Sequence, residues 1–219
     1  VHFLGSPSRT TAIAYRETNL IRSRRESTRA AILQAARQRI AAGGYQAAQM
    51  QIVAADAGVA TGTIYRHFPS KAELFATVFQ RVAGQEVDAV AASAGGPDSA
   101  AIRLQRVAET FIQRALAAPR LAYALLAEPV DPLVEAERLV FRRTYAAILA
   151  DLVDDGIRQA AFPPQSSDLS ATALVGLLAE TLVGPLSPQA ADPPALPVNQ
   201  FTQETVALCL RAVSARSHP

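Results

Sequence analysis

The spacing of apolar residues along this chain is helical over most of its length. Apolar side chains recur three and four positions apart, as in Ile32, Ala35, Ala36 and Ile40, which is the period of one face of an α-helix. No stretch of β-branched residues alternates with polar residues as a half-buried strand does. The pattern therefore predicts an all-α protein of about nine helices.

Glycine and proline residues divide this pattern into separate helices, because both interrupt helical backbone. We expect helices at about 27–42, 51–57, 61–67, 71–92, 100–117, 120–127, 132–160, 167–183 and 199–214. Ser27 or Thr28 is expected to cap the first helix, and Ser70 to cap the fourth with Glu73 in the capping-box position. The prolines between 185 and 198 predict an irregular loop before the last helix.

Composition narrows the class of protein. The 219 residues are 50% hydrophobic, enough for a substantial core. A single cysteine, Cys209, excludes a disulfide within the chain, and with only three histidines we expect no metal site and no cofactor. The most apolar run, 171–186, is interrupted by Glu180, and the first residues lack the pattern of a signal peptide. We expect a cytoplasmic protein without a membrane partner.

Charge is distributed unevenly along the chain. Residues 1–82 carry ten arginines, Lys71 and four acidic residues, a net charge of +7, whereas residues 83–219 carry −5. A basic end on an acidic remainder suggests that this end meets a polyanion, although a solvated arginine-rich tail would look the same. We divide the chain into a mobile basic arm at 1–25, a three-helix domain at 26–72 and a helical domain at 73–219.

The segment 53–74 has the features of a helix-turn-helix. Ala54 and Ala57 are small enough for two short helices to cross closely, and Gly58 supplies the positive φ of a tight turn. Val59 and Ile64 are expected to face inward. The second helix is then free to enter a DNA major groove.

The outward positions of that second helix suit contact with DNA. They are small or polar and comprise Thr61, Gly62, Thr63, Tyr65, Arg66 and His67. Hydroxyl groups and arginine can bind phosphates or base edges. Lys71 lies in the first turn of the next helix, where a cation opposes the helix dipole and is better explained by a nearby phosphate.

These residues resemble a known family. Gly44-Tyr45, Val53-Ala54, Ala57-Gly58-Val59 and the unbroken run 61–74 are similar to the TetR family of bacterial transcriptional repressors. The resemblance covers roughly residues 27–75 and implies an N-terminal DNA-binding domain followed by a helical ligand-binding and dimerisation domain.

The resemblance also implies roles for individual residues. Thr63, Tyr65, His67 and Lys71 would contact DNA, and Phe68 would pack beneath the recognition helix. Arg24 and Arg25 would reach the DNA backbone or minor groove from the start of the first helix. Gln49 and Ala60 stand where the family often has capping Ser or Thr, which leaves the register of individual contacts uncertain by a residue.

The second domain is expected to hold a small-molecule effector. The candidate ligand-binding residues are Phe111, Tyr123, Glu128, Phe141, Arg142 and Tyr145. The segment 126–143 resembles the ligand domains of regulators of fatty-acid or acyl-CoA metabolism, which implies an apolar or acyl-type ligand. The family's dimer interface would fall on the last two helices, at Leu174, Leu178, Leu182, Val206, Leu210 and Val213.

Plainer explanations compete with these roles. His67 could be a structural residue at a helix end, Tyr65 could cover the core edge, and Arg66 or Lys71 could be solvated surface charges. The aromatic candidates and the apolar dimer residues could all be core. At the level of the protein, an enzyme is disfavoured because no catalytic spacing is found. An adaptor that has lost DNA binding is the other alternative.

Overall fold

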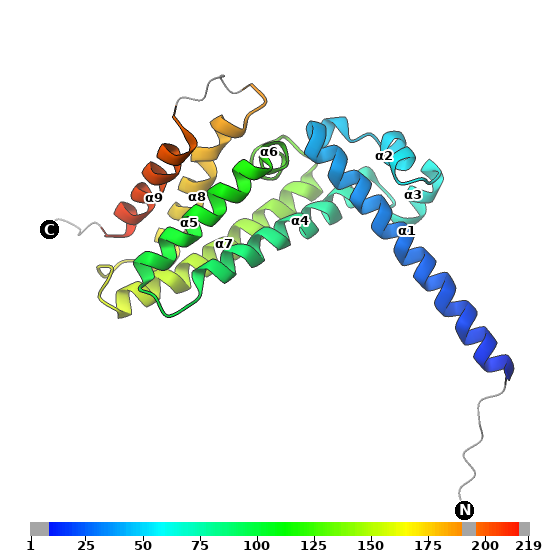
Figure 1. The fold of residues 1–219 in the computed structure, drawn as a ribbon, viewed down its shortest axis with the longest axis horizontal. Coiled ribbons are helices and arrows are strands. Elements are labelled where there is room, and N and C mark those ends of the chain that lie inside the picture. The colour runs from blue at the N-terminus through cyan, green and yellow to red at the C-terminus, as the bar shows by residue number, and fades with distance from the viewer. Residues whose placement is uncertain (1–8, 190–195, 215–219) are drawn as a thin grey trace, which may run out of the picture.

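The computed structural model describes residues 9–189 and 196–214, with side chains from Leu20 onward, and this part of the chain is helical without a strand. Its helices are α1 (Arg9–Ala47), α2 (Met50–Asp56), α3 (Thr61–His67), α4 (Lys71–Ala94), α5 (Ala100–Ala117), α6 (Pro119–Leu126), α7 (Pro132–Arg158), α8 (Ser167–Leu186) and α9 (Val198–Ser214) (Figure 1). The all-α class is confirmed. Every helix after the first begins within one residue of its predicted start. His2, His218 and parts of the expected arm and Pro-rich loop lie outside the described residues.

The first helix is longer than the sequence suggested. It begins at Arg9, not near Ser27 or Thr28, so the expected helix start is wrong, and residues 9–25 continue α1. The physical reason is that this stretch contains neither glycine nor proline, and a polar composition does not by itself stop a helix. Figure 1 shows these N-terminal turns extending away from the rest of the molecule.

The other end of α1 is kinked at Gly44. This residue has φ +79° and ψ −176°, so the helix is broken there and a further turn runs to Ala47. The predicted break at Gly43-Gly44 is therefore present as a kink. Further along, the Ser70 hydroxyl accepts a hydrogen bond from the Glu73 amide at 3.1 Å, which confirms the predicted cap of α4.

Two hydrophobic clusters hold the helices together. The first joins α1–α4 to α6 and the start of α7, with Ile32, Ile64 and Phe75 at its centre. The second is formed by α5, α7, α8 and α9, and Val90 extends α4 into it. Cys209 is fully buried in this second cluster, where burial raises its pKa to about 11, as expected of a cysteine that serves as a small apolar side chain.

Helix α8 is long and apolar enough to cross a membrane by length and composition alone. In the structure, however, one of its faces lies in the second cluster. Its buried residues are Ala171, Leu174, Leu178, Leu182 and Leu186. This is the pattern of a core helix in a globular protein.

Candidate functional site

A four-residue turn joins α2 to α3, and Gly58 makes it possible. Gly58 has φ +66°, yet a Cβ there would meet no atom within 4 Å, so the backbone conformation alone requires glycine. The Val59 amide closes the turn by donating to the Ala54 carbonyl at 3.0 Å. Ala54 and Ile64 are buried where the two helices meet, so the opposite side of α3 faces solvent.

The solvent side of α3 carries the residues that the sequence singled out. Tyr65 is 48% exposed, and Arg66 and Gly62 are exposed, whereas Thr61, Thr63 and His67 are partly exposed. A Cβ at Gly62 would meet no neighbour within 4 Å, so the N-terminal half of α3 is open to a close approach. The Arg66 guanidinium donates to the Thr63 hydroxyl at 2.9 Å and therefore lies along this face.

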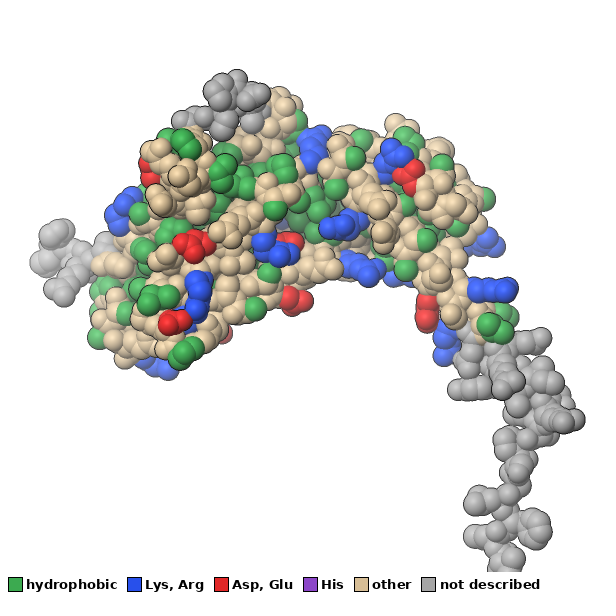
Figure 2. Space-filling view, in the orientation of Figure 1, with side chains coloured by type: hydrophobic (Ala, Val, Ile, Leu, Met, Phe, Trp, Pro, Cys, Tyr) green, Lys and Arg blue, Asp and Glu red, His purple; other side chains and the backbone are tan. Residues whose placement is uncertain are grey.

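Arginines from α1 gather at the C-terminal end of α3. Partial burial lowers the pKa of His67, and the charges of Arg25, Arg29 and Arg66 lower it further. The Arg29 guanidinium lies over the Phe68 ring, 4.8 Å from its centroid. Arg24 is exposed on the same helix. Figure 2 shows Lys and Arg side chains spread over this end of the molecule, and the cluster favours a bound anion.

Arg29 was not among the residues that the sequence analysis predicted to contact DNA, although its spacing from Arg25 could have indicated it. It follows Arg25 by four positions, one turn further along the same face of α1. Because we expected the helix to begin only at Ser27 or Thr28, Arg25 and Arg29 were not placed on one helical face.

Lys71 makes a contact that the sequence did not suggest. Its ammonium lies 5.0 Å from the ring centroid of Tyr45 and 5.3 Å from that of Phe75, and the two rings are 4.7 Å apart. This cation–π contact helps to offset the unfavourable place of a cation at the start of α4. Lys71 is thus held by its own protein, and its contact with DNA stays a prediction.

Arg39 fixes α2 against α1. It forms a two-point ion pair with Asp56, in which its Nη2 lies 2.6 Å from Oδ1. The hydrogen bond from Arg39 lowers the pKa of the Asp56 carboxyl. The ion pair joins α2 to α1 at the surface, in addition to the buried contacts of Val53 and Ala54.

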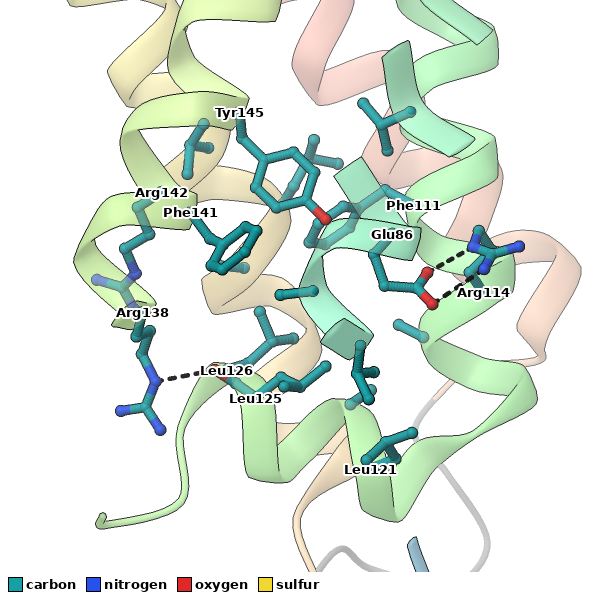
Figure 3. Close-up of a pocket in the computed structure, with 18 of the residues that line it drawn as sticks. Glu86, Phe111, Arg114, Leu121, Leu125, Leu126, Arg138, Phe141, Arg142 and Tyr145 are labelled. Atoms are coloured by element: carbon teal, nitrogen blue, oxygen red, sulfur yellow. Dashed lines mark hydrogen bonds and ion pairs between the residues drawn. The ribbon is translucent and has the colours of Figure 1, made fainter. Parts of the chain in front are cut away.

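A cavity of about 100 Å³ lies in the second domain between α4, α5, α6, α7 and α8. Its walls are mostly apolar. Four of the candidate ligand residues line it, namely Phe111, Phe141, Arg142 and Tyr145 (Figure 3). The rings of Phe111 and Tyr145 meet edge to face, with centroids 5.6 Å apart and planes at 84°.

Several polar side chains reach the walls of this cavity. Arg114 and Glu86 form a two-point ion pair, with Nη2 and Oε1 2.9 Å apart. Arg138 donates to the carbonyls of Leu125 and Glu128, both at 2.8 Å, and pairs with Glu135. Burial raises the pKa of Tyr145, and the nearby charge of Glu86 adds to this effect.

The remaining two candidate ligand residues lie elsewhere. Tyr123 is half-buried against the second hydrophobic cluster and does not line the cavity. Glu128 is only 7% exposed, and its Oε2 accepts a hydrogen bond of 3.0 Å from the Tyr45 amide. The buried carboxylate has its partner at the end of α1.

Comparison with known proteins bears on the first domain. Residues 32–78 match the family model described as bacterial regulatory proteins, tetR family. The transcriptional repressor KstR of Rhodococcus jostii (strain RHA1) is 42% identical over 65 residues, which are 30% of this chain and 31% of the repressor. KstR of Mycolicibacterium smegmatis (strain ATCC 700084 / mc(2)155) is 44% identical over 59 residues, 25% of this chain and 28% of the repressor.

The helix-turn-helix region of this chain is of the TetR type. The chain spans about a third of the length of the curated relatives that it matches, so their likeness covers mainly the helix-turn-helix.

Solved structures extend the similarity in fold to both domains. FadR of Bacillus subtilis, in complex with stearoyl-CoA, is 21% identical with a TM-score of 0.69, over 84% of this chain and 98% of that one. RolR, in complex with resorcinol, is 22% identical with a TM-score of 0.66, over 89% and 91%. At these identities the likeness shows a shared fold.

The six residues expected at a dimer interface lie in the second hydrophobic cluster or beside it. Five of the six are buried within one chain, namely Leu174, Leu178, Leu182, Val206 and Val213, and Leu210 is half-buried. They pack into or against the second hydrophobic cluster, and their contact with a second copy stays a prediction. The large apolar residues exposed on α8 and α9 are Leu169, Val198 and Leu208.

Proposed function

We propose that this chain is a ligand-responsive transcriptional repressor. It binds a palindromic DNA operator as a homodimer and is released by a small apolar or acyl-type ligand in its second domain. The observation that carries the proposal is the outer face of α3, where Gly62, Tyr65 and Arg66 are exposed beside a cluster of arginines.

The arrangement suits a recognition helix in a major groove. Small residues at the N-terminal half of α3 allow close approach to the groove floor, and Thr63 and Arg66 are placed to contact base edges. Tyr65, Lys71 and the arginines of α1 would bind the phosphates on either side. The KstR relatives, which are named as repressors, match this chain in the same region.

The cavity is the proposed effector site. It is lined mainly by apolar and aromatic side chains with a few polar groups, as ligand sites commonly are. FadR and RolR, whose folds are similar, were solved with stearoyl-CoA and resorcinol, respectively. A ligand weakens operator binding only if it binds the operator-bound conformation less tightly than the released one.

Dimerisation is proposed through the solvent faces of α8 and α9, where Leu169 and Leu208 are exposed. A two-fold dimer would present two copies of α3 to half-sites about one helical turn apart or somewhat more. We place such a repressor in the cytoplasm, where its operator would be.

The test is a selection from a pool of random duplex DNA with the purified chain, in the presence and absence of cell extract to supply an unknown effector. The proposal predicts that a palindrome is enriched, that a dimer binds it, and that affinity falls steeply with salt. If no sequence is enriched in either condition, the adaptor alternative replaces the proposal.

A further inference from the structure

One hydrogen-bonding group that faces the cavity has no partner. The ring of Tyr145 packs edge to face against Phe111, and its hydroxyl points into the cavity on the side of Glu86 (Figure 3). Within the described part of the chain, this hydroxyl forms no hydrogen bond, although a phenol can donate one and accept another. The hydroxyl is not among the fully buried unpartnered atoms of the described chain, so it is reachable from the cavity and free to bind a ligand group.

The charged groups around the cavity are already engaged. Arg114 is paired with Glu86, and Arg138 is held by backbone carbonyls and by Glu135. Arg142 is exposed, so its charge is solvated at the edge. Arg142 is thus the one lining cation without a carboxylate partner among the described residues, and it lies at the solvated edge, whereas the Glu86 carboxylate would repel an anion placed beside Tyr145.

A neutral hydroxyl group fits the same position. Because burial and Glu86 raise the pKa of Tyr145, its hydroxyl keeps its proton and remains a donor. Each oxygen of Glu86 accepts one bond from Arg114 and retains capacity for another. A ligand hydroxyl could thus accept from Tyr145 while donating towards Glu86.

The volume of the cavity limits the ligand further. About 100 Å³ is close to the size of an engineered apolar cavity, roughly 150 Å³, that accepts one benzene ring. A long acyl chain would extend beyond this volume, through the open side of the cavity or by displacing wall side chains.

We infer that the cavity takes a compact, uncharged ring that carries a hydroxyl group, of the phenol class, with that hydroxyl bound to Tyr145 beside Glu86. The inference rests on the proposed function in one respect only: binding of this ligand would release the protein from DNA. Binding of the ligand itself can be measured without DNA.

The test uses three molecules of one shape: toluene, p-cresol and p-toluate. Binding to the full chain is measured by calorimetry, for the wild type, for Tyr145→Phe, and for Tyr123→Phe as a matched control outside the cavity. We expect p-cresol to bind most tightly. Tyr145→Phe should weaken p-cresol binding by about five- to tenfold, the effect of one hydrogen bond, and leave toluene binding and the control unchanged.

Three results would overturn the inference: tighter binding of p-toluate than of p-cresol, an equal loss of toluene and p-cresol binding in Tyr145→Phe, or no binding of any of the three. Failure of the proposed function would show differently, as the absence of any enriched DNA sequence while p-cresol still binds.

Discussion

The carboxylate of Glu128 accepts a hydrogen bond of 3.0 Å from the backbone amide of Tyr45 and so ties the loop after α6 to the kinked end of α1. Arg120, at the start of α6, also binds the end of α1, because it donates a hydrogen bond of 2.9 Å to the Gly43 carbonyl. Arg138 donates to the Glu128 carbonyl at 2.8 Å and also lines the cavity. A continuous set of contacts therefore leads from the cavity wall to the helix that carries Arg25 and Arg29.

This connection gives ligand binding a physical route to the DNA-binding domain. Leu121 and Leu125 of α6 face the cavity, whereas Arg120 and Glu128, on either side of them, hold the end of α1. A ligand that displaced α6 would move both anchors of α1 together. The orientation of α3 would change with them, because Arg39 and Asp56 join α2 to α1.

Removal of the Glu128 carboxylate should destabilise the protein. We expect Glu128→Ala to lower the free energy of unfolding by about 1–3 kcal/mol, because the partly buried Tyr45 amide loses its acceptor. Glu128→Gln keeps an acceptor oxygen and should lose less. The measurement is urea unfolding, with Glu137→Ala on α7 as the control. Equal stability of Glu128→Ala and the wild type would contradict the role of this contact.

Two glycine-to-alanine substitutions should have opposite effects. Gly44 has φ +79°, and a Cβ there would lie 2.7 Å from both carboxylate oxygens of Glu128, so Gly44→Ala should cost more than about 1 kcal/mol. Gly84 lies inside α4, and a Cβ there would meet no atom within 4 Å, so Gly84→Ala should stabilise by about 0.4–1 kcal/mol. Thermal unfolding of both variants tests this. A neutral Gly44→Ala would show that the kink is not required.

His67 should make stability depend on pH. Its pKa in the folded chain lies below the ordinary 6.5, through burial and the charges of Arg25, Arg29 and Arg66. As the pH falls below about 6.5, the unfolded chain takes up this proton first, so the folded state loses stability until the pH reaches the folded pKa. Above that window the group has no effect. Urea midpoints at pH 7.5 and 5.5 should differ less in His67→Gln than in the wild type, and an identical difference would exclude this residue as a cause.

Local signals in the sequence were enough to place most helices. Helix α3 spans Thr61–His67 as predicted, because Gly58 before it and Pro69 after it limit where the helix can begin and end. The start of α1 was missed because a polar stretch without glycine or proline carries no stop signal. Periodicity showed that Leu174 and Leu178 lie on an apolar face, but it could not distinguish a partner in the same chain from one in a second copy.

Contacts between distant parts of the chain were beyond sequence reasoning. Glu128 was a candidate ligand residue as a polar group of the predicted effector domain, but its partner Tyr45 lies 83 positions earlier. The sequence predicted several cavity residues correctly as lining the cavity, because Phe111, Phe141 and Tyr145 are large aromatic residues on helices that converge. Which of their polar groups remain unpartnered follows only from the packing.

The central claim is that the outer face of α3 binds DNA, and the most direct test is the affinity of a Tyr65→Ala/Arg66→Gln variant for the selected duplex. Both side chains are exposed, so the fold should persist, which circular dichroism can check. The matched control is Arg143→Gln, an equal charge change at an exposed position on α7. The account predicts binding at least about tenfold weaker in the α3 variant and unchanged in the control. Equal affinities of both variants and the wild type would contradict it.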